Sequence, residues 1–143
     1  MVRVEDRIDI DASIDEVFDY MDQPENQAEI TPSLVESELV ERLPNGGSRA
    51  KYTYSFVGVH LNGEVRATAH DRPHHIAFEM DGDLEGTIEW TLEEANSGTH
   101  ITYVAEYDIP VPVLKSVAES FARRYNEREV TTLLQNLKDR MEA

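Results

Sequence analysis

The chain has 143 residues, no cysteine, and 29 acidic against 13 basic side chains, which gives a formal net charge of −16. This length fits one domain spanning residues 1–143, and the missing thiols exclude disulfides, thiolate nucleophiles and cysteine-ligated metal sites. The negative charge disfavours nucleic-acid binding, because such a surface repels phosphate backbones.

The sequence also carries signals about the compartment. The N-terminal segment is charged and alternating, and no later run is long and apolar enough to span a bilayer. We therefore expect a cytoplasmic protein with no integral membrane segment. Lysine is scarce and acidic residues are spread over the whole chain, a pattern typical of a cytosolic protein from a halophile.

The first 33 residues predict a strand followed by two short helices. Residues 2–10 mostly alternate apolar and polar, as a half-buried strand does. Ser13 and Glu16 have the spacing of a capping box, and an apolar face of Ile14, Val17, Phe18 and Met21 follows them. A second helix opens with proline in the first turn of residues 22–30 and ends at residues 31–32.

From residue 34 to residue 108 the pattern changes to apolar-rich runs separated by turn signals. These signals lie at residues 44–47, 61–63, 71–74, 80–83 and 95–98. Asn-Gly and Asp-Gly pairs favour two-residue hairpins, so the segment predicts six strands in an antiparallel meander. Its expected inward face is Tyr52, Tyr54, Phe56, Val65, Ala67, Ala69, Ile76, Phe78, Met80, Ile88, Trp90, Leu92, Ile101, Tyr103, Ala105 and Tyr107.

The C-terminal segment predicts one long helix that covers this face. After Pro110 and Pro112 the chain runs for roughly 30 residues without glycine or proline. The apolar stripe of Leu114, Val117, Ala118, Phe121 and Tyr125 is displaced around the axis from that of Val130, Leu133, Leu134, Leu137 and Met141. Either the helix bends at residues 126–129, or polar residues such as Glu129 and Asn136 face inward.

Four stretches resemble the START-like (SRPBCC) superfamily, which includes polyketide cyclases and coenzyme Q-binding proteins. They are "IDASIDEVFDYMDQPEN", "HDRPHHIAFEM", "IEWTLEEANSGTHITYVAEYDIP" and "LLQNLKDRME". The resemblance implies an α+β helix-grip fold, in which a curved seven-stranded antiparallel sheet wraps around the long C-terminal helix. It also implies an elongated apolar cavity between sheet and helix. Members bind hydrophobic small molecules, and a minority catalyse reactions.

Two polar clusters are candidates for metal sites, and the residues argue against both. His70, His74 and His75 surround Pro73 at a strand corner, where neighbouring side chains point to opposite faces and do not converge as zinc ligands do. We expect these histidines to face water or the strand edge. Asp81 and Gly82 belong to a hairpin signal and lack the rest of a calcium loop. We expect no metal and no cofactor.

The aromatic side chains expected on the inward face are the candidate ligand-binding residues. They are Tyr52, Tyr54, Phe56, Phe78, Trp90, Tyr103, Tyr107, Phe121 and Tyr125. Plain core packing is the competing interpretation. Small residues between them, Ala67, Ala69 and Ala105, favour an unfilled volume, in which tyrosine hydroxyls would orient a ligand carbonyl or hydroxyl.

Three functions follow as hypotheses. The first is a carrier or sensor of a lipid, quinone or polyketide-like molecule. The second is a polyketide cyclase or dehydratase in which Tyr54, Tyr103 or Glu129 acts as acid or base. The third is a regulator that binds a protein partner. The sequence names neither the ligand nor the oligomeric state, and it leaves open whether a reaction is catalysed.

Overall fold

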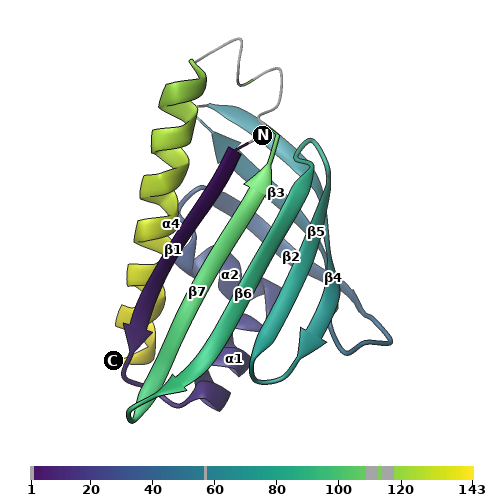
Figure 1. Ribbon diagram of the computed structural model, residues 1–143. Helices are drawn as coiled ribbons and strands as arrows, with labels where there is room; N and C mark the ends of the chain where they lie inside the picture. The colour runs from purple at the N-terminus through teal and green to yellow at the C-terminus, as the bar shows by residue number, and fades with distance from the viewer. Residues whose placement is uncertain (1, 57, 109–112, 114–117) are drawn as a thin grey trace.

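The computed structural model describes residues 2–56, 58–108, 113 and 118–143. Seven antiparallel strands form one curved sheet in the order β1-β7-β6-β5-β4-β3-β2 (Figure 1). The elements are β1 (Val2–Ile10), α1 (Ile14–Met21), α2 (Pro24–Ile30), β2 (Leu34–Arg42), β3 (Ser48–Phe56), β4 (Val59–Asp71), β5 (His75–Gly82), β6 (Gly86–Ala95), β7 (Gly98–Tyr107) and α4 (Glu119–Met141).

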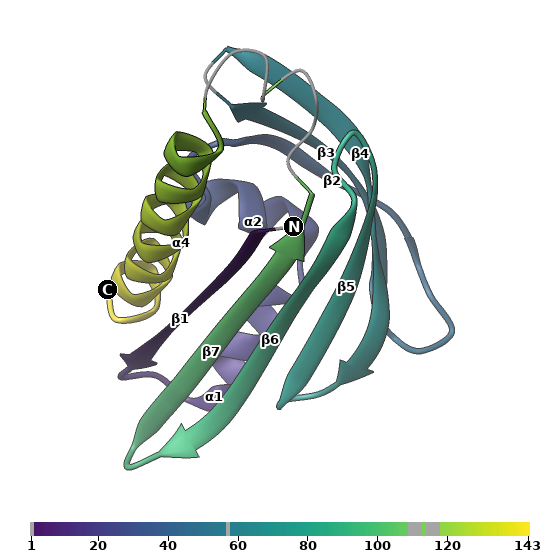
Figure 2. The ribbon, with the colours of Figure 1, turned by 45° about the horizontal axis from the view of Figure 1, so that its top comes forward.

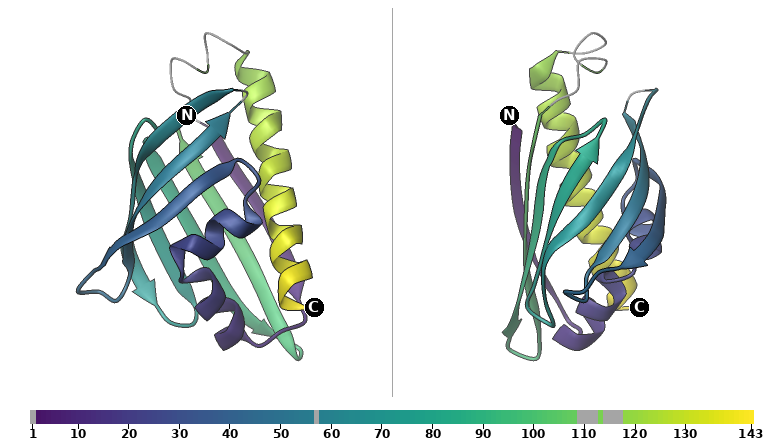
Figure 3. Two further views of the ribbon diagram at one scale, coloured as in Figure 1. Left: turned by 180° about the vertical axis from the view of Figure 1, so that it is seen from behind. Right: turned by 90° about the vertical axis from the view of Figure 1, so that its right-hand side faces the viewer.

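The helices lie on the concave side of the sheet. Figures 2 and 3 show α4 running along this side next to β1, with α1 and α2 beside its C-terminal half. Contacts of α4 with β1 and α2, and of α1 with β6 and β7, hold this layer in place. The arrangement confirms the predicted helix-grip architecture. In the described ranges, no helix combines the length and the apolar character that crossing a membrane requires.

Helix α1 forms where the capping signal predicts it. The backbone N–H of Glu16 donates to Ser13 Oγ at 3.2 Å, and Ser13 itself has an extended backbone. The four predicted apolar residues of α1 are all buried. They pack in one cluster with residues of β5, β6, β7 and α4. Burial of this stripe, and not helix propensity alone, stabilises so short a helix.

Helix α4 is shorter than the sequence predicts. Ala118 has an extended backbone and acts as the N-cap of α4, so a single helix running through residue 118 is wrong. The predicted residues Pro110, Pro112, Leu114 and Val117 lie outside the described residues. At 23 residues, α4 is about 34 Å long, enough to cross the sheet.

Polar residues of α4 face inward, which explains why the apolar stripe predicted for the C-terminal segment is displaced around the axis. The backbone N–H of Ser33 donates to Glu129 Oε1 at 2.7 Å, and Asn136 Nδ2 donates to the Ile30 carbonyl at 2.9 Å. Both bonds join α4 to the two ends of the α2–β2 connection. Of the two alternatives left by the sequence, the one with inward-facing polar residues is confirmed.

One predicted turn is wrong. Residues 61–63 lie inside β4, and the β3–β4 hairpin closes between Phe56 and Val59, where Gly58 has a φ of +81°. The Asn-Gly pair has a different role. Gly63 is paired with Tyr52, and a β-carbon on it would collide with the Tyr52 hydroxyl and with the Asp81 backbone oxygen. The glycine is therefore required by packing within the strand.

A second departure arises from a bulge in β4. The register with β5 shifts between Ala67 and Ala69, so that His70 lies opposite Ile76. Residues directly opposite each other share a face, and Ile76 is fully buried in the core. Beyond the bulge His70 therefore faces inward and Ala69 outward, the reverse of the simple alternation expected from sequence.

Candidate ligand-binding cavity

A cavity of about 180 Å³ lies between the sheet, α2 and α4. One water molecule needs about 10–15 Å³ of such space, so the volume is suited to a small organic molecule. Its walls come from every strand and from all three described helices. Most of the lining is aliphatic or aromatic, as in small-molecule binding sites.

Seven of the nine predicted ligand-binding residues line this cavity. They are Tyr52, Tyr54, Phe56, Phe78, Trp90, Tyr103 and Tyr107. Strand alternation places them there, since β3, β5, β6 and β7 each turn every second side chain toward the concave face. Whether they contact a ligand stays a prediction.

The structure places Phe121 and Tyr125 outside the lining. The Phe121 side chain is 49% exposed, so the expectation that it faces the cavity is wrong. Tyr125 stands behind Phe56 with ring centroids 4.5 Å apart, and its hydroxyl lies 2.6 Å from Ser33 Oγ. The face that lines the cavity is Asn126, Glu129, Val130 and Leu133, with the spacing i, i+3, i+4 and i+7.

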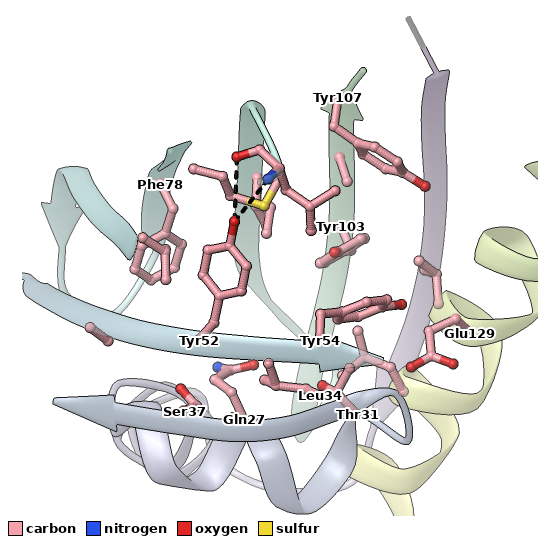
Figure 4. Close-up of a pocket in the computed structure, with 18 of the residues that line it drawn as sticks. Gln27, Thr31, Leu34, Ser37, Tyr52, Tyr54, Phe78, Tyr103, Tyr107 and Glu129 are labelled. Carbon is pink, nitrogen blue, oxygen red and sulfur yellow. Dashed lines mark hydrogen bonds between the residues drawn. The ribbon is translucent and has the colours of Figure 1, made fainter. Parts of the chain in front are cut away.

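Polar residues lie on two sides of the cavity, with Gln27, Thr31 and Ser37 toward α2 and β2 and a second group toward α4. Figure 4 shows Tyr54, Tyr107 and Glu129 on this side with Tyr103 beside them. The Tyr103 ring is held edge-on against Trp90, with centroids 4.7 Å apart. The Tyr107 hydroxyl is buried and has no hydrogen-bond partner among the described residues. We refer to these four residues, Tyr54, Tyr103, Tyr107 and Glu129, as the polar end.

The three tyrosines of the polar end are hydrogen-bond donors at neutral pH. Burial raises the pKa of Tyr54, Tyr103 and Tyr107 well above the ordinary tyrosine value, and the negative charge of Glu129 adds to the effect on each. A protonated tyrosine donates to a carbonyl or hydroxyl oxygen. The sequence alone indicates Glu129 only as a possible inward-facing or acid–base residue. The structure places it among three such donors.

These raised pKa values predict a loss of stability in alkali. A tyrosine in the unfolded chain ionises near pH 10, whereas the buried ones stay protonated, so the folded state holds more protons above about pH 10. The stabilisation is fully present below that pH and is lost as the pH rises through the raised values. Urea unfolding at increasing pH, followed together with tyrosinate absorbance, should show the buried tyrosines ionising only as the protein unfolds. Complete ionisation of all six tyrosines in folded protein near pH 10 would contradict the expectation.

Tyr52 lines the cavity with a hydroxyl that is already occupied. It accepts from the Leu84 backbone N–H at 3.1 Å and lies 3.1 Å from the Asp81 carbonyl, to which it donates (Figure 4). These hydrogen bonds hold the connection between β5 and β6 against β3 at the cavity wall. Tyr52 therefore offers a ligand its ring, while the hydroxyl has a structural role.

The histidines of the Pro73 corner are separated from one another. His70 is only 12% exposed, its Nε2 lies 3.0 Å from Asp22 Oδ1, and its ring contacts Phe18 edge-on. The expectation that it faces water is wrong, because the β4 bulge turns it inward. His74 is exposed, and His75 Nε2 lies 2.9 Å from Glu89 Oε2. Within the described ranges no group of three His, Asp or Glu side chains is placed to hold a metal ion.

The sequence matches a known protein family. The profile of the family described as "Polyketide cyclase / dehydrase and lipid transport" matches residues 1–142. The chain belongs to this family. As a member of the polyketide cyclase / dehydrase and lipid transport family it shares its architecture with solved structures, whereas comparison with curated proteins gives no sequence match.

Three solved structures illustrate the shared fold. The protein TTHA0849 from Thermus thermophilus has a TM-score of 0.84 and 17% identity, over 97% of this chain and 96% of that one. A START superfamily protein from Mycobacterium smegmatis gives 0.81 and 13%, over 98% and 97%. The di-domain ARO/CYC StfQ from the steffimycin biosynthetic pathway gives 0.78 and 16%, over 99% of this chain and 50% of that one. At these identities the likeness shows the fold alone.

Proposed function

We propose that this protein binds a hydrophobic small molecule, such as a lipid, quinone or polyketide-like compound, in the cavity between the sheet and α4. The observation that carries the proposal is an apolar cavity with a buried Tyr107 hydroxyl that has no hydrogen-bond partner among the described residues. A buried polar group without a partner is destabilising, and a ligand oxygen would supply the missing acceptor. We further propose that it acts as a single domain in the cytoplasm.

The family supports this proposal at the level of chemistry. Its description combines cyclase or dehydrase activity with lipid transport, and both require a cavity that accepts an apolar molecule. Apolar contacts would supply most of the affinity, because removal of apolar surface from water is favourable and non-directional. The polar end would fix the orientation.

An enzymatic function is the second candidate, and Glu129 is the observation that favours it. Its carboxylate is held by the Ser33 N–H beside tyrosines that stay protonated. Glu129 would remove a proton from the carbon next to a ligand carbonyl. The electron pair would move onto the carbonyl oxygen, which accepts a hydrogen bond from Tyr103 or Tyr54. A carrier function requires no such turnover. Conversion of a polyketide-like probe that is abolished by Tyr103→Phe, with binding retained, would favour the enzyme.

Filling the cavity tests the binding function. Ala105 is buried in the cavity wall on β7, so Ala105→Leu adds three carbons to the cavity. We expect it to weaken binding of the uncharged probe N-phenyl-1-naphthylamine at least about tenfold, which corresponds to roughly 1.4 kcal/mol. Fluorescence titration measures the change.

Ala77→Leu is the matched control for this experiment. Ala77 lies on β5 opposite Glu89, whose side chain is exposed on the outer face of the sheet. The control should bind the probe as the original protein does. Equal affinities for all three proteins would show that the probe binds elsewhere and would remove support for the cavity.

A further inference from the structure

The aromatic side chains of the protein are concentrated on the wall of the cavity that the sheet forms. The sequence contains four phenylalanines, six tyrosines and one tryptophan, and seven of these eleven residues line the cavity. They are Tyr52, Tyr54, Phe56, Phe78, Trp90, Tyr103 and Tyr107, from β3, β5, β6 and β7. The lining residues that α1, α2 and α4 contribute in the described ranges include no aromatic residue. A molecule in the cavity would therefore find its aromatic contacts on the sheet.

Three of these rings are held in fixed positions by neighbouring residues. The Tyr103 ring lies edge-on against Trp90, with centroids 4.7 Å apart. The Phe56 ring contacts Tyr125, with centroids 4.5 Å apart. Tyr52 is fixed through its hydroxyl, which accepts from a backbone N–H of the connection between β5 and β6. A wall of fixed rings is preorganised for a rigid molecule and needs no rearrangement to receive one.

The size of the cavity limits the kind of molecule that it can enclose. A cavity of about 150 Å³ lined by leucine, isoleucine and phenylalanine is large enough to bind benzene. The volume in this protein is about 180 Å³, which leaves room for one compact system of one or two fused rings. A long acyl chain fills far more space than a benzene ring. Part of such a chain would stay outside in water, where it gains nothing from apolar burial.

Flexibility and ring contacts act in the same direction as size. A flexible chain loses internal rotations when it is confined, whereas a fused ring system has none to lose. Aromatic rings that meet edge to face or offset also attract each other beyond the effect of the buried area. Apolar burial by itself is non-directional, so these two effects help to decide between molecules of equal carbon number.

Resting on the proposed function, we propose that the cavity selects compact ring systems, aromatic ones above all, over flexible acyl chains. Among the ligands named above, the quinone and polyketide-like classes fit because both carry rings, whereas lipids with long chains do not. The selection is made by the size of the cavity and by the aromatic residues of β3, β5, β6 and β7.

Three alcohols with ten carbons each test this selectivity by isothermal titration calorimetry at neutral pH. They are 2-naphthol, decahydro-2-naphthol and 1-decanol, and each carries one hydroxyl group. Area burial alone would rank 1-decanol first, because its extended chain exposes the most apolar surface to water. We expect the opposite order, with decahydro-2-naphthol at least about threefold and 2-naphthol at least about tenfold tighter than 1-decanol. Binding of 1-decanol as tight as that of either ring compound would overturn the inference.

Substitution of Phe78 isolates the contribution of one ring. Its side chain lines the cavity, and Figure 4 shows it among the side chains of the sheet wall. Phe78→Leu keeps an apolar side chain but removes the ring, so 2-naphthol should bind about threefold to tenfold more weakly. The affinity for 1-decanol should not fall, because the smaller side chain leaves more space. An equal loss for both probes would show that Phe78 supplies apolar surface alone, and it would overturn the role assigned to the rings.

Phe121→Leu is the matched control. Phe121 is 49% exposed and lies outside the cavity lining, so the same exchange there should leave all three affinities unchanged. A loss of 2-naphthol affinity equal to that of Phe78→Leu would overturn the assignment of the effect to the cavity wall.

The outcomes separate this inference from the function on which it rests. Binding of 1-decanol as tight as that of the ring compounds would leave the cavity as a ligand site and overturn only the selectivity. Binding of none of the three probes to the original protein would overturn the proposed function, and the selectivity with it. Should Phe78→Leu fail to fold, the order of the three affinities on the original protein decides, since it needs no variant.

Discussion

Replacing Gly63 with alanine is expected to destabilise the protein by about 3 kcal/mol, at the upper end of the usual cost of overpacking. The added methyl group would collide with the Asp81 backbone oxygen in β5 and with the Tyr52 hydroxyl, which lies over the glycine. Neither neighbour can retreat cheaply, because Asp81 is in the strand ladder and Tyr52 is bonded to the Leu84 backbone. Chemical denaturation in urea measures the change in free energy of unfolding.

Gly58→Ala is the control for this variant, because it measures the cost of replacing a glycine where the added methyl group meets no other atom. Gly58 has a φ of +81° but open space where a β-carbon would lie. We expect a cost of about 1–2 kcal/mol there, from the left-handed backbone alone. If Gly63→Ala costs no more than Gly58→Ala, then β4 and β5 can separate at this point and the proposed role of Gly63 is wrong.

Removing the Tyr107 hydroxyl should make the protein more stable and a poorer binder. The hydroxyl is buried and finds no partner in the part of the chain that the structure describes. Such a group costs about 1–3 kcal/mol, so Tyr107→Phe should stabilise the fold by about 1 kcal/mol. It should also weaken binding of 2-naphthol by about tenfold, because the ligand loses one hydrogen bond from a desolvated donor. Urea denaturation and calorimetric titration give the two quantities.

Tyr52→Phe is the matched control, and its effect on stability should have the opposite sign. The Tyr52 hydroxyl is bonded to the backbone of Asp81 and Leu84, so its removal leaves the buried Leu84 N–H without a partner and costs about 1–3 kcal/mol. Destabilisation by both substitutions would mean that Tyr107 has a partner within the folded protein. Its hydroxyl would then not be reserved for a ligand.

The parts of the fold that were predictable rest on local signals. The Ser13 cap and the stripe of Ile14, Val17, Phe18 and Met21 define α1 without help from the rest of the chain. Strand alternation places most of the inward aromatic residues correctly for the same reason, since a period of two depends only on the strand itself. The family resemblance supplied the order in which these elements pack, and the structure confirms it.

The errors arise where a long-range contact overrides a local signal. Asn62 and Gly63 have the composition of a hairpin turn, but the glycine is needed because Tyr52 from the neighbouring strand lies across it. The β4 bulge leaves no clear mark in the sequence, yet it reverses the faces of Ala69 and His70. Neither effect is visible before the strands are paired.

The sequence predicts the cavity residues on the strands, but it does not identify the residues of α4 that line the cavity. Two apolar stripes on this segment left the inward face undecided. The inward face of α4 is the one whose Glu129 accepts a hydrogen bond from the Ser33 backbone N–H. This face places Asn126, Glu129, Val130 and Leu133 in the cavity lining. The same orientation of the helix places Phe121 at the surface. The spacing of these four residues was present in the sequence, but their polar members made the stripe unrecognisable as an inward face.

A crystal structure of the protein purified from its native host would show whether the cavity holds a ligand. We expect electron density for an apolar small molecule between the sheet and α4. An oxygen of that molecule should lie within hydrogen-bond distance of Tyr107 Oη. A cavity that holds only ordered water, with the Tyr107 hydroxyl bonded to it, would show that the protein carries no such ligand. A cavity closed by inward movement of α4 would show the same.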